Sequence, residues 1–272
     1  MNGKTVLVTG GTSGIGRIAA RALVAKGARV VVVGRDEKRL AALRNEGMEV
    51  IQADLSLVRE TRKAAREFRD RFDELDVLLN NAGAIFGEYK ETSEGFERTF
   101  ALDHLGYFVI TTELLDLLKA SHGRVVSVSS GAHQAGKLNF DDLQMKKGFS
   151  GMRQYCNAKL MNLLFSNELA RREPSITSNA LHPGAIASGF AGTGAGWAGA
   201  FFKLARPFLL SEEQGAQTSI WAMSDPSIAK ETGKYFFKKR AKTPSSAARS
   251  EENARRLWTE TVAMVERISR SP

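Results

Sequence analysis

Residues 4–27 have the sequence KTVLVTGGTSGIGRIAARALVAKG, in which a short apolar strand, a glycine-rich turn and a helix follow one another. Apolar residues recur at helical spacing after Gly14, and Gly27 stands where a glycine caps the C-terminus of a helix. The stretch therefore predicts the first strand, turn and helix of an α/β fold.

Strands and helices continue to alternate along the chain. RVVVVG (29–34) is a continuous β-branched run, which is typical of a strand buried on both faces. Five further strands are expected at MEVIQADL (48–55), LDVLLNNAG (75–83), GRVVSVSS (123–130), ITSNALHPG (176–184) and GKYFF (233–237). We therefore expect a doubly wound α/β fold with a seven-stranded, mostly parallel sheet and helices on both faces. No linker rich in Pro or Ser divides the chain, so residues 1–272 are expected to form one domain.

Four longer helices are expected in the second half of the pattern. The first runs over 93–118 with Ser93 as its N-cap, and the second covers 151–172. Ser211 and Gln214 form a capping box for a third helix over 212–223. The last helix, about 251–269, is predicted to dock on the domain through one stripe of residues. This stripe consists of Ala254, Leu257, Thr261, Met264 and Ile268.

Composition narrows the class of protein. The single cysteine, Cys156, cannot form an internal disulfide, which suits a reducing compartment. No secretory signal is visible, so a cytoplasmic location is expected. Residues 174–202 carry no charge over a length that could cross a bilayer. Because His182-Pro183-Gly184 and further glycines interrupt this segment, we expect a strand, a turn and a mobile apolar loop instead of a membrane span.

The net charge of +9 raises the question of nucleic acid. Basic residues are spread along the chain, with small concentrations at 35–39 and 238–242, and no aromatic residues are interleaved with them. No DNA- or RNA-binding motif is present. The sequence therefore favours a solvated basic surface and a polyanionic small ligand, with a nucleic-acid binder as the alternative. No metal site is predicted.

The glycine-rich turn TGGTSGIG (9–16) predicts a dinucleotide site. Its glycines allow the backbone to approach a pyrophosphate, and the following helix N-terminus offers free N–H groups and a partial positive charge. The spacing differs from G-x-G-x-x-G, so the prediction depends on the position at the first strand–helix junction. A purely structural turn is the alternative. The residues expected to contact the cofactor here are Gly10, Thr12, Ser13, Gly14, Ile15, Gly16 and Arg17.

Arg35 follows the second strand, where such folds approach the adenosine ribose. An acid at this point binds the ribose 2′-hydroxyl, whereas Arg accommodates a 2′-phosphate. The sequence therefore favours NADP(H) over NAD(H), and Arg17, Lys38 and Arg39 could add to the positive field. The alternative is a solvated Arg beside Asp36.

Tyr155 and Lys159 are four residues apart in QYCNAKLMN (154–162), so on a helix they would lie on one face. A phenol titrates near 10, and a role near neutral pH needs a shift worth about 3–4 kcal/mol. An ammonium about 5 Å away supplies about 0.8 kcal/mol in bulk water and about 3.3 kcal/mol at an effective dielectric constant near 20. The pair is therefore useful only in a pocket that excludes water; otherwise it is an ordinary surface Tyr and Lys.

Together these motifs resemble those of the short-chain dehydrogenase/reductase family, specifically its retinol-dehydrogenase-like branch. The resemblance covers almost the whole chain and implies a Rossmann-type fold. It is carried by TGGTSGIG, ADL (53–55), NNAG (80–83), HLGYF (104–108), VVSVSS (125–130), YCNAK (155–159), HPG (182–184) and RRLW (255–258). Unlike membrane-anchored members, the chain shows no leading hydrophobic anchor, so none is expected.

The resemblance implies a role for each matching residue. Ser130 would polarise the carbonyl or alcohol, and Tyr155 would be the general acid/base. Lys159 would bind the nicotinamide ribose and lower the pKa of Tyr155. The remaining implied cofactor contacts are Asp54 and Leu55 beside the adenine, Asn81, Ala82 and Gly83 in the cleft, and Pro183, Gly184, Ile186 and Ser188 on the nicotinamide side.

Asp103 is the departure from the family pattern, because the family has Asn at this point of the catalytic set. A carboxylate accepts hydrogen bonds but adds a charge and offers no donor. We expect Asp103 to favour a protonated Lys159 and to alter the pH optimum; the alternative is a tolerated change without consequence.

The implied reaction is hydride transfer between nicotinamide and a carbonyl or alcohol carbon. The segment 189–210 is expected to be a mobile apolar substrate lid, which favours an apolar aldehyde, ketone or alcohol, or else it packs on the core or a partner. Retinoid use is suggested by the resemblance alone. The alternative function is a catalytically impaired NADP(H)-binding regulator. Homo-oligomerisation through the helices over 94–118 and 151–172 is also suggested only by the resemblance.

Overall fold

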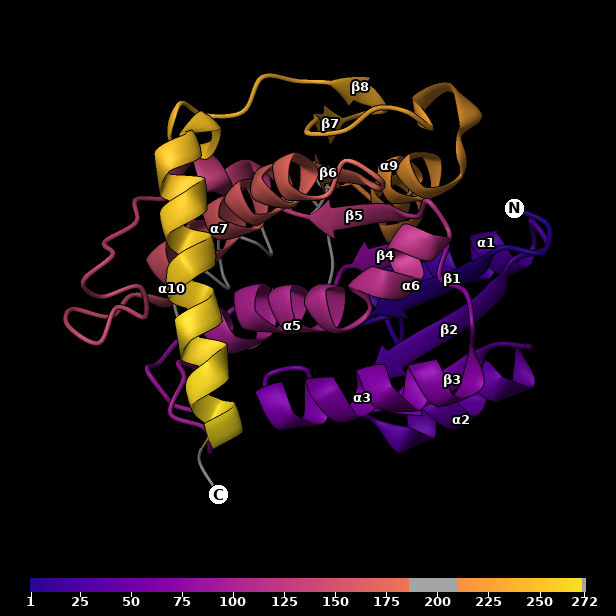
Figure 1. Cartoon of the computed structure of the whole chain (residues 1–272), viewed down its shortest axis with the longest axis horizontal. Helices are drawn as coiled ribbons and strands as arrows, with labels where there is room; N and C mark the ends of the chain where they lie inside the picture. Colours follow the sequence, from indigo (N-terminus) through magenta and orange to yellow (C-terminus); the bar gives the residue numbers. More distant parts are fainter. Residues whose placement is uncertain (186–209, 271–272) are drawn as a thin grey trace.

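The computed structural model describes residues 1–185 and 210–270, and within them one eight-stranded sheet crosses the molecule (Figure 1). The strand order is β3-β2-β1-β4-β5-β6-β7-β8, and β1 to β7 pair in parallel. The order reverses between β1 and β4, which confirms the doubly wound, mostly parallel sheet. The strands are β1 (Thr5–Thr9), β2 (Arg29–Gly34), β3 (Glu49–Gln52), β4 (Val77–Asn80), β5 (Arg124–Val128), β6 (Thr177–His182), β7 (Tyr235–Phe237) and β8 (Arg240–Ala241).

The short eighth strand was not predicted. β8 pairs antiparallel with β7 through a two-residue turn in which Lys238 and Lys239 have φ of 49° and 60°. Tight hairpins of this geometry usually contain Asn-Gly or Asp-Gly, which adopt positive φ easily. Lys238 and Lys239 give no such turn signal, so the sequence analysis predicted seven strands and missed β8.

Helices cover both faces of the sheet. On one face, α3 (Val58–Arg71), α5 (Gly106–Glu113) and α7 (Gly151–Arg172) share a core with Leu7 and Leu78. On the other, α1 (Gly14–Val24), α2 (Glu37–Asn45) and α9 (Glu212–Ser224) share a core with Val8 and Leu79. Neighbouring residues of one strand thus enter opposite cores. This two-sided burial explains why the strands are continuous apolar runs.

Two of the predicted helix ends are confirmed. Gly27, three residues after α1, has φ of 79°, a conformation that glycine adopts without strain. At α9, the Ser211 hydroxyl accepts the N–H of Gln214, while the Gln214 side chain accepts the N–H of Ser211.

The C-terminal helix α10 (Glu251–Arg270) packs against α7 and α3 (Figure 1). Trp258 stacks on Phe165 of α7 with ring centroids 5.9 Å apart, and it meets Phe108 of α5 edge-on at 4.9 Å. Ala254, Leu257 and Thr261 are buried, and Met264 and Ile268 pack against the same core. α10 therefore covers part of both helices through which subunit contacts were suggested.

The helix predicted over 93–118 is wrong at its start and in its continuity. Ser93 lies in a turn, and the helical segment begins with α4 (Arg98–Phe100), where the Glu97 carboxylate accepts the N–H groups of Thr99 and Phe100. A π-helix, η1 (Ala101–Leu105), follows before α5, and a break at Leu114 separates α5 from α6 (Leu115–Ala120). Glu is a weaker N-cap than Ser, so the local signal favoured the wrong residue.

Candidate active site

The predicted site residues converge at the carboxyl ends of β1, β4, β5 and β6. The glycine turn follows β1, 81–83 follow β4, Ser130 follows β5, and 183–184 follow β6. This edge, at a reversal of strand order, is where open parallel sheets bind ligands. Ile186, Ser188 and the predicted lid, apart from Leu210, lie outside the described residues.

The glycine turn is pressed against the turn that follows β4. Gly10 has φ of 66°, and a Cβ atom there would lie 2.7 Å from the Cα of Ala82. The Asn81 side-chain amide donates to the carbonyls of Thr9 and Gly10 at 2.9 and 3.2 Å. The Thr9 hydroxyl accepts the N–H of Asn81 at 2.8 Å. Asn81 and Ala82 therefore fix the shape of the turn from behind.

The N-terminus of α1 is suited to an anion. Its N-cap, Ser13, makes no side-chain capping hydrogen bond, and the first turn carries no acidic residue. The helix dipole and the free N–H groups favour negative charge at this end. Thr12, Ser13 and Gly14 also line a cavity of about 550 Å³ that opens beside this end.

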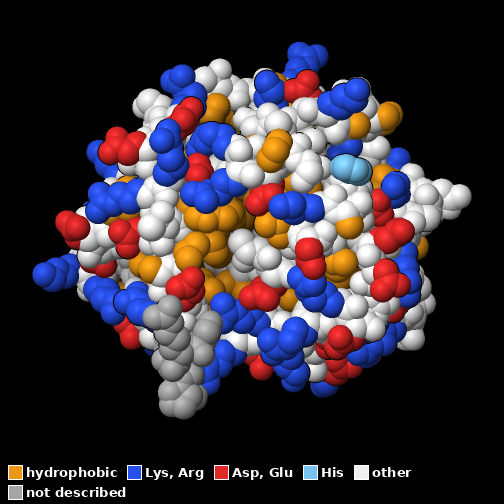
Figure 2. Space-filling view, in the orientation of Figure 1, with side chains coloured by type: hydrophobic (Ala, Val, Ile, Leu, Met, Phe, Trp, Pro, Cys, Tyr) orange, Lys and Arg blue, Asp and Glu red, His pale blue; other side chains and the backbone are white. Residues whose placement is uncertain are grey.

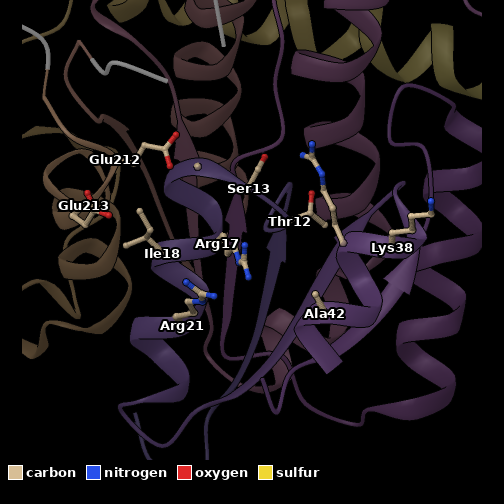
Figure 3. A pocket seen from close by; sticks show the side chains of 11 residues that line it. Thr12, Ser13, Arg17, Ile18, Arg21, Lys38, Ala42, Glu212 and Glu213 are labelled. Atoms are coloured by element: carbon tan, nitrogen blue, oxygen red, sulfur yellow. The ribbon is translucent and has the colours of Figure 1, made fainter. Parts of the chain in front are cut away.

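This cavity is bordered by four cations (Figure 3). Arg17 and Arg21 come from α1, and Lys38 and Arg39 come from α2. The Glu46 carboxylate receives Arg17 at 2.6 Å and Arg21 at 2.7 Å, and these guanidinium groups lower the pKa of Glu46 to about 2. The rest of the lining consists of Thr12, Ser13, Gly14, Ile18, Ala42, Glu212 and Glu213. No proposed catalytic side chain lines this cavity.

Arg35 lies next to the predicted adenine-flanking residue. Its guanidinium Nη1 is 3.7 Å from Asp54 Oδ2, and its side chain is 68% exposed. Gln52 holds the Arg35 carbonyl through an amide donor at 3.1 Å. Leu55, next to Asp54, is buried. The ends of β2 and β3 therefore bring Arg35 and Asp54 together, with Leu55 next to Asp54.

Ser130, Tyr155 and Lys159 meet where β5 ends against α7. The Ser130 hydroxyl accepts the N–H of Ala132 at 3.2 Å and is hydrogen-bonded to the Tyr155 hydroxyl. Lys159 Nζ lies 5.4 Å from the centroid of the Tyr155 ring and donates to the Val128 carbonyl at 3.4 Å. Lys159 is buried, so its charge acts in a water-poor environment.

Asp103, on the π-helix η1, completes this cluster. Its Oδ2 atom is 2.9 Å from Lys159 Nζ, and its Oδ1 atom accepts the N–H of Ala84 at 2.8 Å. Burial alone would lower the pKa of Lys159, but the nearby charge of Asp103 raises it overall. The expected preference for a protonated Lys159 therefore agrees with the structure.

Lys159 lowers the pKa of Tyr155 as expected, but other groups outweigh this effect in the net pKa of the phenol. Burial raises the pKa of this phenol, Lys159 opposes the rise, and Asp103 adds to it, so the net direction is upward. The family resemblance predicts the Lys159 ammonium beside Tyr155, but it predicts Asn and not a carboxylate at position 103. The Asp at position 103 accounts for part of the difference.

Comparison with known proteins identifies the family. The short chain dehydrogenase family model matches residues 4–195. Human retinol dehydrogenase 12 is 38% identical over 94% of this chain and 84% of its own. DnrU of Streptomyces sp. (strain C5), whose name gives daunorubicin C-13 ketoreductase as its proposed activity, is 34% identical over 97% of this chain and 93% of its own. A crystal structure of an uncharacterized Mycobacterium paratuberculosis protein has a TM-score of 0.80 at 29% identity, covering 97% of this chain and 94% of the other.

This chain belongs to the short-chain dehydrogenases. Its relatives also place it in the retinol-dehydrogenase-like branch. Among the described helices of this short-chain dehydrogenase, none is long and apolar enough to cross a bilayer.

Two histidines that the sequence analysis missed support the site of this short-chain dehydrogenase. His133 Nε2 accepts the N–H of Ser245, so Nδ1 carries the proton and donates to the Ser130 carbonyl at 2.6 Å. His182 Nδ1 accepts the N–H of Gly184, and its ring stacks on Phe237. Burial lowers the pKa of His182 to about 4. The HPG motif was a signal for His182, whereas nothing local marked His133.

Proposed function

We propose that the protein is an NADP(H)-dependent oxidoreductase that transfers a hydride between nicotinamide and the carbonyl or alcohol carbon of an apolar substrate. Ser130, Tyr155 and Lys159 are the proposed catalytic set, with Asp103 beside them. The observation that carries the proposal is their convergence at the sheet edge that also holds the glycine turn, with Lys159 and Asp103 buried and Ser130 and Tyr155 half-buried. Membership of the short-chain dehydrogenases supports an alcohol or carbonyl substrate.

The residues present fit a dinucleotide. The close approach of Gly10 to Ala82 leaves no room for a side chain, and the uncapped start of α1 suits a pyrophosphate. Asp54 and Leu55 would border the adenine, Asn81–Gly83 the cleft, and Pro183 and Gly184 the nicotinamide side. When bound, the nicotinamide supplies or accepts the hydride.

Positive charge supports NADP(H) over NAD(H). Lys38 and Arg39 face the cavity beside Thr12, and Arg35 follows β2 near Asp54. Arg17 and Arg21 both pair with the single Glu46 carboxylate, so these three side chains together carry a net positive charge on the cavity wall. These basic side chains suit a ribose 2′-phosphate, because one guanidinium group can donate two parallel hydrogen bonds to two phosphate oxygens.

The protein's own groups would act on the reacting oxygen of the substrate. Ser130 and Tyr155 are joined by a hydrogen bond and can both donate to that oxygen, which stabilises the charge that develops on it. Tyr155 gives up its proton in reduction and takes one in oxidation. His133 holds the backbone of Ser130, and the Val128 carbonyl receives Lys159, Tyr107 and Asn162 at 3.3–3.4 Å.

The apolar substrate class is supported by the names of relatives. Several relatives are named as dehydrogenases of retinol, a largely apolar alcohol, and another is named for reduction of a daunorubicin ketone. The test is NADPH consumption with a panel of lipophilic aldehydes and ketones.

Tyr155→Phe is the decisive variant for this function. It removes the proton donor but keeps the ring, so the rate of carbonyl reduction should fall by at least about 10²-fold. NADPH binding, measured by fluorescence or calorimetry, should persist. Tyr89→Phe is the matched control, because that hydroxyl bonds to Glu91 and is not among the catalytic groups. Full activity in Tyr155→Phe would reject the assignment, and NADPH binding without turnover of any carbonyl would favour the impaired regulator.

A further inference from the structure

The Asp103 carboxyl group lies beside the Lys159 ammonium, close to Tyr155. Burial raises the pKa of this carboxyl, whereas the Lys159 charge and the Ala84 N–H oppose the rise and favour the carboxylate. The side chains of Asp103 and Lys159 are 0% and 3% exposed, with 2.9 Å between Oδ2 and Nζ. Ala84 donates its N–H to the other carboxylate oxygen at 2.8 Å. A Cβ atom on Gly83 would lie 2.8 Å from Asp103 Oδ2 and 3.2 Å from Lys159 Nζ. The turn after β4 therefore packs directly on the ion pair and leaves it little freedom to separate.

The groups that act on Tyr155 come from three elements. Lys159 and Cys156 belong to α7, Asp103 to the π-helix, and Ser130 to the end of β5. Burial and the Asp103 carboxylate favour the phenol, whereas the Lys159 ammonium and the Ser130 hydroxyl favour the phenolate. Tyr107 is the further titratable group near Lys159, with its ring centroid 5.7 Å from Nζ. Since the ion pair has no net charge, it stabilises the phenolate less than a lone ammonium would.

We propose that Asp103 is a positioning residue that offsets the field of Lys159 and keeps Tyr155 as a phenol, so that the site is built to donate a proton in carbonyl reduction. This inference rests on the proposed function. In that step, the carbonyl carbon gains a hydride from the reduced nicotinamide, and the C=O π pair moves onto oxygen. The oxygen then takes the Tyr155 proton. The substrate gains two electrons and two hydrogens, and solvent reprotonates the Tyr155 phenolate.

The two reaction directions should depend on pH differently. Reduction needs the phenol, so its rate should stay constant through neutral pH and fall only as Tyr155 titrates in the alkaline range. Oxidation needs the phenolate, so its rate should rise about tenfold per pH unit through the neutral range. Without the Asp103 charge, both changes should occur at lower pH, and oxidation at neutral pH should become faster.

Titration of Tyr155 tests the inference without cofactor or substrate. The tyrosinate absorbance of the protein is followed against pH, and the trace of Tyr155→Phe is subtracted to isolate this one phenol. The wild-type midpoint should lie above the value of about 10 for a free phenol. In Asp103→Asn it should fall by about 1 pH unit or more. Glu97→Gln is the control, because it removes another buried carboxylate that is not among the groups acting on Tyr155.

A wild-type midpoint near neutral pH, or a midpoint in Asp103→Asn that is unchanged or higher, would overturn the inference. A wild-type midpoint near neutral pH would overturn the inference even if the variant does not fold. The activity measurement compares oxidation by both proteins at neutral pH, where Asp103→Asn should be about tenfold faster for each pH unit by which the titration midpoint falls. A structural defect alone would not accelerate a reaction. If no carbonyl or alcohol reacts at all, the proposed function fails, while the titration still decides the role of Asp103.

Discussion

Gly83 lies where the turn after β4 touches the ion pair of Asp103 and Lys159. Gly83→Ala would place a methyl group 2.8 Å from one charged atom and 3.2 Å from the other. Both are buried and have little space to move, so we expect the pair to shift and carbonyl reduction to fall roughly 10- to 100-fold. The control is Gly87→Ala, where a Cβ atom meets nothing within 4 Å. Equal activity of the two variants would contradict this account.

Arg35 provides a test of cofactor preference at a single side chain. It is largely exposed, and its 3.7 Å contact with Asp54 leaves donors for a second anion. Arg35→Ala should weaken NADPH binding by about tenfold, the value of one charge-assisted hydrogen bond, and should leave NADH binding nearly unchanged.

The matched control for Arg35 is Arg44→Ala on α2. Arg44 pairs with Glu37 at 2.6 Å and does not line the basic cavity, so it removes the same charge without the proposed contact. The measurement is the dissociation constant of NADPH and of NADH for the wild type and for both variants. If Arg35→Ala weakens NADPH and NADH equally, the residue does not read the 2′-phosphate.

At the scale of elements, a hydrogen bond joins α10 to the π-helix that carries Asp103. His104 Nε2 and Thr261 Oγ1 are 2.9 Å apart, and Thr261 donates its own proton to the Leu257 carbonyl at 2.7 Å. His104 Nε2 must therefore be the donor. Because His104 directly follows Asp103, this bond helps to hold the segment that carries the Asp103 side of the Asp103–Lys159 ion pair.

Thr261→Val keeps the shape of the side chain but leaves the buried His104 N–H without its partner. We expect the free energy of unfolding to fall by about 1–3 kcal/mol and carbonyl reduction to fall with it. Thr259→Val is the control on the same helix, since its hydroxyl donates to the Arg255 carbonyl on the exposed side. Urea denaturation and turnover of the two variants give the comparison, and equal losses in both would exclude a special role for the His104 bond.

The elements also show where sequence patterns stop being sufficient. β1, β2 and the glycine turn are predictable because each local signal agrees with burial on both faces of the sheet. Ser130, Tyr155 and Lys159 follow from their motifs. The π-helix is different. Its Asp103 and His104 are buried, and they contact Lys159 of α7 and Thr261 of α10, which lie far along the chain. For the same reason the direction of the Tyr155 pKa could not come from the Tyr–Lys spacing alone.

At the scale of the whole molecule, the net charge of +9 is dispersed. Figure 2 shows Lys and Arg interspersed with Asp and Glu on the face that carries α3, α5 and α10. Charged side chains of the described residues also form surface pairs, such as Arg69 with Asp116 and Lys119 with Glu173. Such a face supports the solvated basic surface expected from the sequence. Salt-sensitive retention on duplex DNA that NADPH does not compete would favour the nucleic-acid alternative.

His104, which is buried, and His182, which is half-buried, should make the folded protein sensitive to acid. Burial lowers the pKa of His104 to about 3 and that of His182 to about 4, from 6.5. Below about pH 6.5 the unfolded chain binds these protons and the folded protein does not, so stability is present above that pH and is lost as the pH falls. His104 alone should lower the free energy of unfolding by about 2 kcal/mol between about pH 7.5 and pH 5. Glu46, whose folded pKa is about 2, should contribute only below its ordinary value of 4.5.

Urea denaturation at these two pH values checks the prediction, and His104→Asn identifies the group responsible. The variant removes one buried proton-binding site, so its loss of stability between the two pH values should be smaller than that of the wild type by about 2 kcal/mol. The variant is also expected to be less stable at both pH values, because it breaks the bond to Thr261. The comparison therefore uses the difference between pH values within each protein. If both proteins lose the same stability on acidification, His104 is not a group whose proton uptake drives unfolding.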